Sequence, residues 1–436
     1  MAQSPGPRSS RVPRLTGPTR IYHGWHVAWV VFLSTGLSIG MAQYAFGVFG
    51  PELEEEFGWS RTQVNASLSF AFISGMSAPL VGRLADRFGT RPVLVVSLLL
   101  AATGFALRPL ISELWHLYLF STLVYVGFPG ATVLPAGKMV GLWFPTTRGR
   151  MMGMVTAGNN FGGLTMVPFA AALVALAGWR WAYFGFGVML AVLAVAALAI
   201  IRERASDVEA EIDRTGRTES FGGEVKAAAR AGLTVSQALR TPAFYLVTVA
   251  ITAATFTYQG IITQLIQHLE NVGISHGAAS AALSLVAAMG IGSKLAFGRA
   301  SESIGARQAM VISTALQALG LGLMIAPGGT MAVWAGVFVF GLGFGGLGAL
   351  IVLVVSETFG LREYGGIMGL VQFATIISFA GGPLLAGMVF DATGSYQNWF
   401  AAIIGIFALG ITALLLTRRP SFPRQAEEPK GVSTAD

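Results

Sequence analysis

Long apolar runs, separated by short polar segments, make up most of the chain between residues 24 and 417. Each run can cross a bilayer as one helix, because about 20 residues span the hydrocarbon core. We predict twelve such helices, at residues 24–50, 61–82, 92–110, 113–143, 148–176, 180–201, 240–267, 277–297, 307–326, 331–356, 363–389 and 397–417. The pattern therefore predicts an all-α membrane protein.

The chain also repeats itself at an offset of 216 residues. Residues 82–92 read Gly-Arg-Leu-Ala-Asp-Arg-Phe-Gly-Thr-Arg-Pro, and residues 298–307 are a weaker copy of this charged, glycine-bounded segment. The same offset relates Met152-Gly153 to Met368-Gly369. Paired halves of this kind are typical of transporters that rock around a central site. We predict two pseudo-symmetric six-helix bundles, at residues 22–203 and 239–418.

Three polar segments lie outside the bundles, at residues 1–21, 204–238 and 419–436. Their composition predicts a disordered N-tail, a linker and a C-tail. The linker is interpreted as a tether, with a docking or regulatory segment as the alternative. Arg and Lys concentrate in these segments and in the loops on the same side, whereas the opposite loops carry most of the remaining Glu residues. The positive-inside rule then predicts an inner (plasma) membrane protein with both termini cytoplasmic.

Composition excludes several classes of function. The chain has 436 residues, of which 11% are charged, against about 25% in soluble domains. Its net charge of +7 lies in short loops between apolar spans, which indicates membrane topology rather than nucleic-acid binding. The sequence has no cysteine, no Walker loop and no histidine–carboxylate cluster with metal-ligand spacing. We expect a monomer in the lipid bilayer that is not an enzyme and uses no cofactor, metal or nucleic acid.

The segment at residues 82–92 resembles the signature between spans 2 and 3 of the major facilitator superfamily. Further segments resemble its branch of monocarboxylate transporters and oxalate/formate antiporters. These segments are Tyr22-His23-Gly24-Trp25, Gly47-Val48-Phe49, Phe57-Gly58-Trp59-Ser60, Trp143-Phe144-Pro145 and Arg148-Gly149. The resemblance covers residues 22–417 and implies a carrier, without naming its substrate.

Two lysines within predicted spans are the candidate anchors for a substrate. Charges inside a membrane are costly and are functional candidates by default, and Lys138 and Lys294 are the clear cases. The resemblance implies a carboxylate-binding arginine in span 8, four residues before a glycine; here Lys294 stands four residues before Gly298. Lysine keeps the charge but loses the bidentate fork. The alternative for both lysines is that the long stem snorkels to the interface.

Polar side chains on the helices expected to line the cavity complete the predicted substrate site, because amide and phenol groups can orient a carboxylate. Each of them alone is also explained by a hydrogen bond between helices. They are Gln43, Tyr44, Asn159, Asn160, Tyr258, Gln259, Gln264, Gln372 and Thr375. No carboxylate stands in mid-span, and the place at which the resemblance implies an aspartate in proton-coupled members is Gly290.

Residues of the repeated segment are predicted to gate the carrier. Gly82 and Gly89 are expected to allow a tight turn. The charged residues are expected to pair with opposite charges and with helix C-terminal carbonyls at the membrane rim. The alternative is a topology anchor with no gating role. The predicted gating residues are Gly82, Arg83, Asp86, Arg87, Gly89, Arg91, Gly298, Arg299 and Arg307.

We therefore expect a secondary active transporter that moves a small organic anion by alternating access, a monocarboxylate such as lactate or pyruvate. An unpaired cation in the cavity favours an anion, whose own charge supplies the partner. A co-transported proton and an exchanged anion both stay open as coupling partners. The alternatives are a dicarboxylate/monocarboxylate exchanger, an exporter of a hydrophobic drug-like compound, and a transporter-like sensor that binds without translocating.

Overall fold

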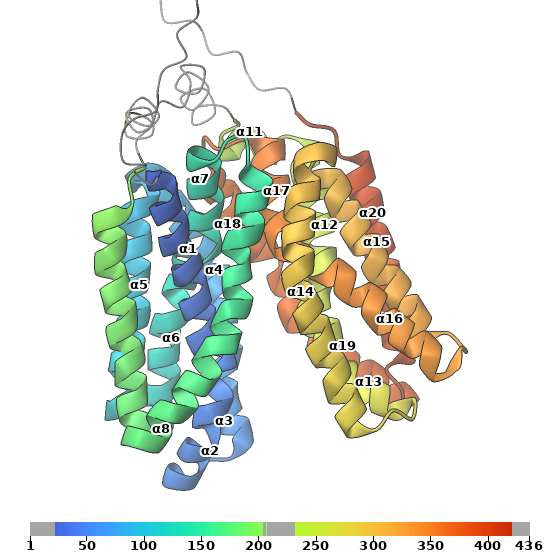
Figure 1. The fold of residues 1–436 in the computed structure, drawn as a ribbon, viewed down its shortest axis with the longest axis horizontal. Helices are drawn as coiled ribbons and strands as arrows, with labels where there is room; N and C mark the ends of the chain where they lie inside the picture. The colour runs from blue at the N-terminus through green and yellow to red at the C-terminus, as the bar shows by residue number, and fades with distance from the viewer. Residues whose placement is uncertain (1–21, 204–205, 207–231, 421–436) are drawn as a thin grey trace, which may run out of the picture.

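A computed structural model of the chain describes residues 22–203, 206 and 232–420. The predicted N-tail, most of the predicted linker and nearly all of the predicted C-tail lie outside the described residues. The described segments form two helical bundles that lie side by side (Figure 1). The start of α1 (His23–Ile39), the short helix α11 (Val235–Leu239) and the end of α20 (Gln397–Leu416) lie at the same end of the two bundles, which we call the linker end (Figure 1).

The described part of the first half contains eight α-helices. They are α1 His23–Ile39, α2 Phe46–Phe57, α3 Arg61–Ser69, α4 Phe72–Phe88, α5 Thr90–Ala106, α6 Leu114–Ala131, α7 Val133–Trp143 and α8 Arg148–Ile200. Gly178, with φ 80° and ψ 164°, divides α8 into two helices. Only glycine adopts this backbone conformation without strain.

The second half begins after the short helix α11 Val235–Leu239, which packs against α12 and α18. Its helices are α12 Pro242–Phe256, α13 Leu265–Asn271, α14 His276–Ile304, α15 Ala306–Ile325, α16 Gly329–Phe344, α17 Leu347–Phe359, α18 Tyr364–Ala374, α19 Ile376–Thr393 and α20 Gln397–Leu416. Across the described ranges, eleven segments are long and apolar enough to span a membrane, and α8 contains two of the helices. The predicted twelve-helix fold is therefore confirmed.

The first membrane helix of each half contains a π-helical segment at the equivalent position. These segments are η1, Gly40–Tyr44, and η3, Thr257–Ile262, and the offset of 216 maps residues 40–44 onto 256–260. A π-segment frees backbone groups that need another partner in lipid. In η3, the indole N–H of Trp399 donates to the carbonyl of Gly260 at 2.7 Å. The repeat therefore extends to a local irregularity, and π-segments are frequent at functional sites.

The structure corrects the prediction that residues 82–92 form a loop. Helix α4 continues to Phe88, and only Gly89, with φ 97°, turns the chain into α5. Gly82 lies inside α4 and not at a turn; a Cβ there would collide with the backbone of Gly365 in α18. The prediction ended the helix at the first charged residue, but α4 extends beyond its apolar stretch. Gly82 is needed for close helix packing.

The two bundles meet at the linker end and diverge toward the opposite end (Figure 1). Two equivalent glycine contacts make the close approach possible. A Cβ on Gly365 would lie 2.5 Å from the carbonyl oxygen of Gly82, and a Cβ on Gly298 would lie 2.5 Å from that of Gly149. Each contact pairs one helix of the first half with one helix of the second. The contacts therefore hold α4 against α18 and α8 against α14.

Candidate functional site

Lys294 lies in α14, where this helix packs against α8 of the other half. Its side chain is 7% exposed. Ten residues separate it from the end of α14 at Ile304, which corresponds to about 15 Å of helix. The last part of this length carries Arg299 and Glu302 and lies beyond the apolar run that ends at residue 297. A place for Lys294 in the central site of a rocking-bundle transporter stays a prediction.

The amine of Lys294 has only neutral partners. It donates to the carbonyl oxygen of Thr156 at 3.2 Å and to Oδ1 of Asn160, both on α8. No ion pair in the described part of the chain includes Lys294. A lysine ammonium has three N–H donors. One donor therefore stays available, and the charge has no counter-ion.

Asn160 connects the two halves a second time. Its Nδ2 donates to the carbonyl oxygen of Ala287 on α14 at 3.3 Å, while its Oδ1 accepts from Lys294. Gly153, two turns earlier in α8, has no side chain to keep the backbone of Lys294 away. Lys294 and Asn160, which were predicted separately as site residues, are therefore brought together, and the Thr156 carbonyl adds a contact that no side-chain pattern can reveal.

Lys138 lies in a different place. It belongs to α7, five residues and about 7 Å before the end of that helix at Trp143. Its amine donates to the carbonyl oxygen of Ala85 at 3.2 Å and lies 3.6 Å from Oδ1 of Asp86. Lys138 and Lys294 share no partner, so the structure does not bring the two lysines together. A role for Lys138 in substrate binding stays a prediction.

The two π-segments carry the predicted phenols. Tyr44 is exposed and Tyr258 is half-buried. The ring of Tyr258 packs against Phe344 and Phe379, with centroid distances of 5.7 and 6.3 Å. Gln43, beside Tyr44, is exposed, and the side chain of Gln259 lies outside the described residues. The segments thus present polar groups from both halves.

The side-chain oxygens of two other predicted amides are buried without partners in the described ranges. Oδ1 of Asn159 and Oε1 of Gln372 have no hydrogen bond within the described ranges. A buried polar atom without a partner needs an explanation, and a polar ligand is one. Thr375 donates to the carbonyl of Gln372 at 2.7 Å, where the chain breaks between α18 and α19. Gln264 precedes α13 at the end of the first membrane helix of the second half.

At the linker end, Asp86 holds the start of α18. Its Oδ1 accepts from the backbone N–H of Gly365 at 3.1 Å and its Oδ2 from that of Gly366 at 2.6 Å. The first N–H groups of a helix lack partners within the helix. Glu363, the residue before α18, does not cap them with its side chain. A carboxylate from α4 therefore caps a helix of the other half, where the helix dipole favours negative charge.

Glu302 makes the equivalent contact from the second half. It lies in α14, 216 residues after Asp86. Its Oε1 accepts from the backbone N–H of Arg150 at 2.9 Å, in the first turn of α8, and its Oε2 lies 2.8 Å from Nε of the same arginine. Sequence reasoning missed both Glu302 and Arg150. The repeat contained the signal for Glu302, because the offset places it opposite Asp86.

Two further carboxylates, one in each half, cap a helix of their own half. Glu203 accepts from the backbone N–H of Thr90 at 2.5 Å, and Glu357 accepts from that of Ala306 at 3.0 Å. Thr90 and Ala306 are themselves 216 residues apart, at the starts of α5 and α15. These caps were also missed, because Glu203 had been assigned to the boundary of the linker and Glu357 lies beyond the predicted end of its span.

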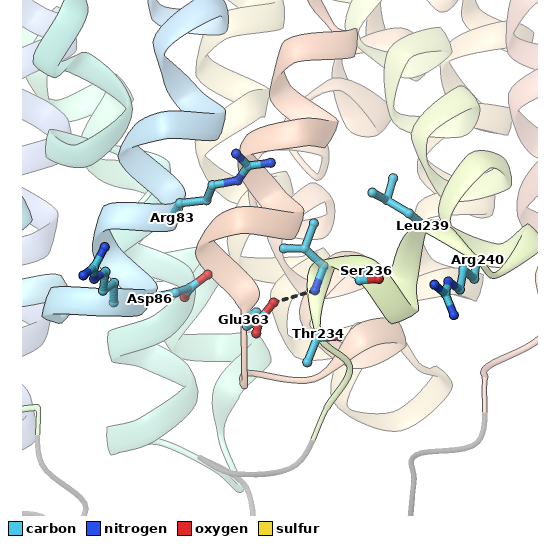
Figure 2. A pocket seen from close by; sticks show the side chains of 9 residues that line it. Arg83, Asp86, Thr234, Ser236, Leu239, Arg240 and Glu363 are labelled. Carbon is cyan, nitrogen blue, oxygen red and sulfur yellow. Dashed lines mark hydrogen bonds between the residues drawn. The ribbon is translucent and has the colours of Figure 1, made fainter.

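The predicted pairing of arginines with helix C-terminal carbonyls is found at two positions. Arg91 donates to the carbonyl of Leu198 at the end of α8, and Arg307 to that of Thr417 at the end of α20. Arg83 and Arg87 line a pocket at the linker end (Figure 2), and Arg299 is exposed. Whether any of these residues gates transport stays a prediction.

Comparisons with known proteins agree with this geometry. A family model described as Major Facilitator Superfamily matches residues 31–299 and 252–435. Monocarboxylate transporter 3 of the rat is 29% identical over 404 residues, which cover 91% of this chain and 79% of the relative.

Two solved structures share the fold. The human organic anion transporter superposes with a TM-score of 0.66 at 18% identity, over 90% of this chain and 99% of that chain. The fucose:proton symporter of E. coli superposes with a TM-score of 0.69 at 14% identity, over 92% and 100%. At these identities the likeness establishes the fold alone.

Proposed function

The chain belongs to the major facilitator superfamily, and from that premise we propose that it carries a small monocarboxylate across the membrane by alternating access. It is a multi-pass membrane transporter. The observation that carries the proposal is the buried ammonium of Lys294, which has two neutral acceptors and no counter-ion among the described residues. The name of the rat relative supports the same substrate class.

The charge of Lys294 favours an anion as the ligand. Removing an ion from water costs several kcal/mol, which neutral acceptors offset only in part. A carboxylate that takes the remaining N–H of Lys294 supplies the missing charge. One unpaired lysine suits one carboxylate, so a monocarboxylate fits better than a dicarboxylate. The same charge repels cationic drugs.

The contacts of Lys294 suggest how binding connects to movement. In the described state its amine joins α14 to α8 of the other half. A carboxylate on the remaining N–H of this amine adds a charged partner beside the bond to Asn160 and thus changes a contact between the halves. A ligand shifts a conformational equilibrium by its difference in affinity for the two states. Phenols of the two π-segments and the amides Asn159 and Gln372 are proposed to orient the rest of the substrate.

We assign the linker end to the cytoplasm, because the positive-inside rule favours that orientation. The two bundles, which we assign to residues 22–203 and 239–418, then diverge toward the outer side of the membrane in the described state. Coupling to protons would run through the substrate or a lysine, since Gly290 stands where the family resemblance implies an aspartate in proton-coupled members. A Cβ on Gly290 would make ordinary contact with Phe344 at 3.4 Å, so an aspartate can be introduced there as a test.

A binding screen followed by a transport assay tests the proposal. Purified protein is heated with monocarboxylates, dicarboxylates and hydrophobic cations, because a ligand of the native state raises Tm by mass action. We expect lactate, pyruvate or a similar monocarboxylate to raise Tm and to show counterflow of label in proteoliposomes. Stabilisation by dicarboxylates or drugs alone would contradict the substrate class. Stabilisation without counterflow would indicate a sensor.

A further inference from the structure

A second cationic site lies at the linker end, apart from Lys294. A pocket of about 720 Å³ forms where the two halves and the segment around α11 meet (Figure 2). Helix α4 of the first half contributes Arg83, Asp86 and Arg87, and residue Glu363 precedes α18 of the second half. The α11 segment contributes Thr234, Val235, Ser236, Leu239 and Arg240. In Figure 2, Arg83 and Arg240 lie on opposite sides of Glu363 and Thr234.

The two carboxylates of the pocket are already engaged. Asp86 accepts from two backbone N–H groups of α18 and lies 3.6 Å from the amine of Lys138. Glu363 accepts from the backbone N–H of Val235 at 2.6 Å. Neither carboxylate forms an ion pair with an arginine of the pocket within the described ranges.

The three arginines leave a surplus of positive charge. Arg87 lies over the ring of Phe88, with 5.2 Å between its guanidinium carbon and the ring centroid. No carboxylate of the described residues pairs with Arg83 or Arg240, and both are exposed. The pocket lining carries three arginines against two carboxylates, which leaves one positive charge in excess. This excess favours an anion as the ligand.

We propose that this pocket binds a phosphate ester. Guanidinium groups match the oxygens of phosphate in bidentate geometry, and charge-assisted hydrogen bonds of this kind are the strong ones. The hydroxyls of Thr234 and Ser236 add neutral donors. The volume falls in the range of small-molecule sites, about 300–1,000 Å³, and leaves room for more than the phosphate group. The exposed side chain of Leu239 offers an apolar contact for the organic part.

The pocket is lined by residues of both halves, so a ligand that binds it is expected to regulate transport. Arg83 belongs to α4, whereas the α11 segment is fixed to the second half, because Val235 donates to Glu363 and the N–H of Leu233 donates to the carbonyl of Phe359 at 2.8 Å. Separation of the halves at this end would remove one wall. A ligand that binds the assembled pocket therefore stabilises the described state and slows the transport cycle. It does so without contact with Lys294.

Phosphate esters reach this pocket from two sources, a soluble metabolite or the headgroup of an anionic phospholipid. Glycerol 3-phosphate is the probe for the soluble source. Nanodiscs of phosphatidylcholine, with and without phosphatidic acid, are the probe for the lipid source. The readout is the Tm of the purified full-length protein, which needs no transport activity and no knowledge of the transported substrate.

Arg240→Gln is the test variant and Arg362→Gln its matched control. Both arginines are exposed near α18, but only Arg240 lines the pocket. We expect Arg240→Gln to weaken binding of the effective probe at least about tenfold, or ~1.4 kcal/mol. Ser236→Glu, which places a carboxylate in the pocket, is expected to abolish it. Arg362→Gln is expected to bind as the wild type does.

The outcomes separate the sources and decide the proposal. A rise in Tm with glycerol 3-phosphate that Arg240→Gln weakens assigns a soluble ligand. A rise with phosphatidic acid alone, weakened in the same way, assigns a lipid. The proposal is overturned if neither probe raises Tm, or if Arg362→Gln loses as much binding as Arg240→Gln. Because every readout is binding, failure here leaves the monocarboxylate proposal untouched.

Discussion

Asp86 and Glu302 stand at equivalent positions of the two halves, and each caps a helix of the other half at the linker end. Asp86 accepts from two backbone N–H groups, has Lys138 beside it and is 11% exposed. Glu302 accepts from one backbone N–H group and pairs with Arg150; it is 18% exposed, and Arg150 is 51% exposed. The Asp86 contact is thus the more buried and the richer in donors.

The difference predicts unequal contributions to the closed linker end. Exposed ion pairs contribute about 0–1 kcal/mol, because water screens them and both side chains lose freedom. Hydrogen bonds to a charged group, in contrast, contribute about 1.5–3 kcal/mol. We therefore expect the Asp86 contact to dominate and the Glu302 contact to be auxiliary.

The glycines below these contacts should give the largest effect, and it should be equal in the two halves. Leucine at Gly82 or Gly298 would collide with a backbone, which cannot move aside as a side chain can. We expect Gly82→Leu and Gly298→Leu each to abolish closure of the linker end and nearly all transport. The chain has no cysteine, so alkylation of Ser301→Cys, a buried position on α14, reports opening. Unchanged alkylation would contradict the close approach.

Asp86→Asn comes next. It keeps the size of the side chain but loses the charge that faces the α18 N-terminus. We expect transport to fall at least about tenfold, corresponding to the ~1.5–3 kcal/mol of a charge-assisted bond, while substrate affinity stays nearly constant. Parallel measurement of uptake and of Tm shift with substrate separates the two. An equal loss of binding and rate would argue for misfolding or direct substrate contact.

Lys138→Gln tests which site this lysine serves. Lys138 lies beside Asp86, so we expect a loss of transport smaller than that of Asp86→Asn, with substrate affinity unchanged. The double variant with Asp86→Asn should be little worse than Asp86→Asn alone, because the two residues act through one contact. If Lys138→Gln instead removes substrate binding, Lys138 belongs to the substrate site.

Glu302→Gln should give the smallest effect. Its partner Arg150 is half exposed, so the expected change is within about 1 kcal/mol, or less than about fivefold in rate. Raising the salt concentration should mimic the substitution, because screening weakens exposed pairs. A loss as large as that of Asp86→Asn would show that the two contacts are equivalent and would remove the asymmetry.

The sequence was sufficient for the architecture. Twelve apolar runs and the 216-residue offset are properties of side chains in order, and both predict the two bundles without further information. In contrast, the predicted end of α4 at residue 82 was wrong. The helix continues to Phe88, because an exposed helix end accommodates charged residues, so the first charge does not mark where the helix stops.

The partners of the site residues were beyond sequence reasoning for a physical reason. Asp86 accepts from backbone N–H groups, and Lys294 donates to a backbone carbonyl. Every residue type carries a backbone carbonyl, and all but proline carry the N–H, so the sequence does not indicate which of them is the partner. Lys138 and Asp86 lie 52 residues apart on different helices, and only the tertiary fold brings them together. The repeat did carry usable information that was not used, namely the equivalence of Asp86 and Glu302.

The central claim is that the charge of Lys294 holds the anion. Counterflow of the labelled monocarboxylate found in the binding screen, measured for wild type, Lys294→Gln and Lys294→Arg in proteoliposomes, tests it most directly. We predict no counterflow for Lys294→Gln and partial counterflow for Lys294→Arg, which keeps the charge but changes its geometry. Normal counterflow by correctly inserted Lys294→Gln would contradict the account.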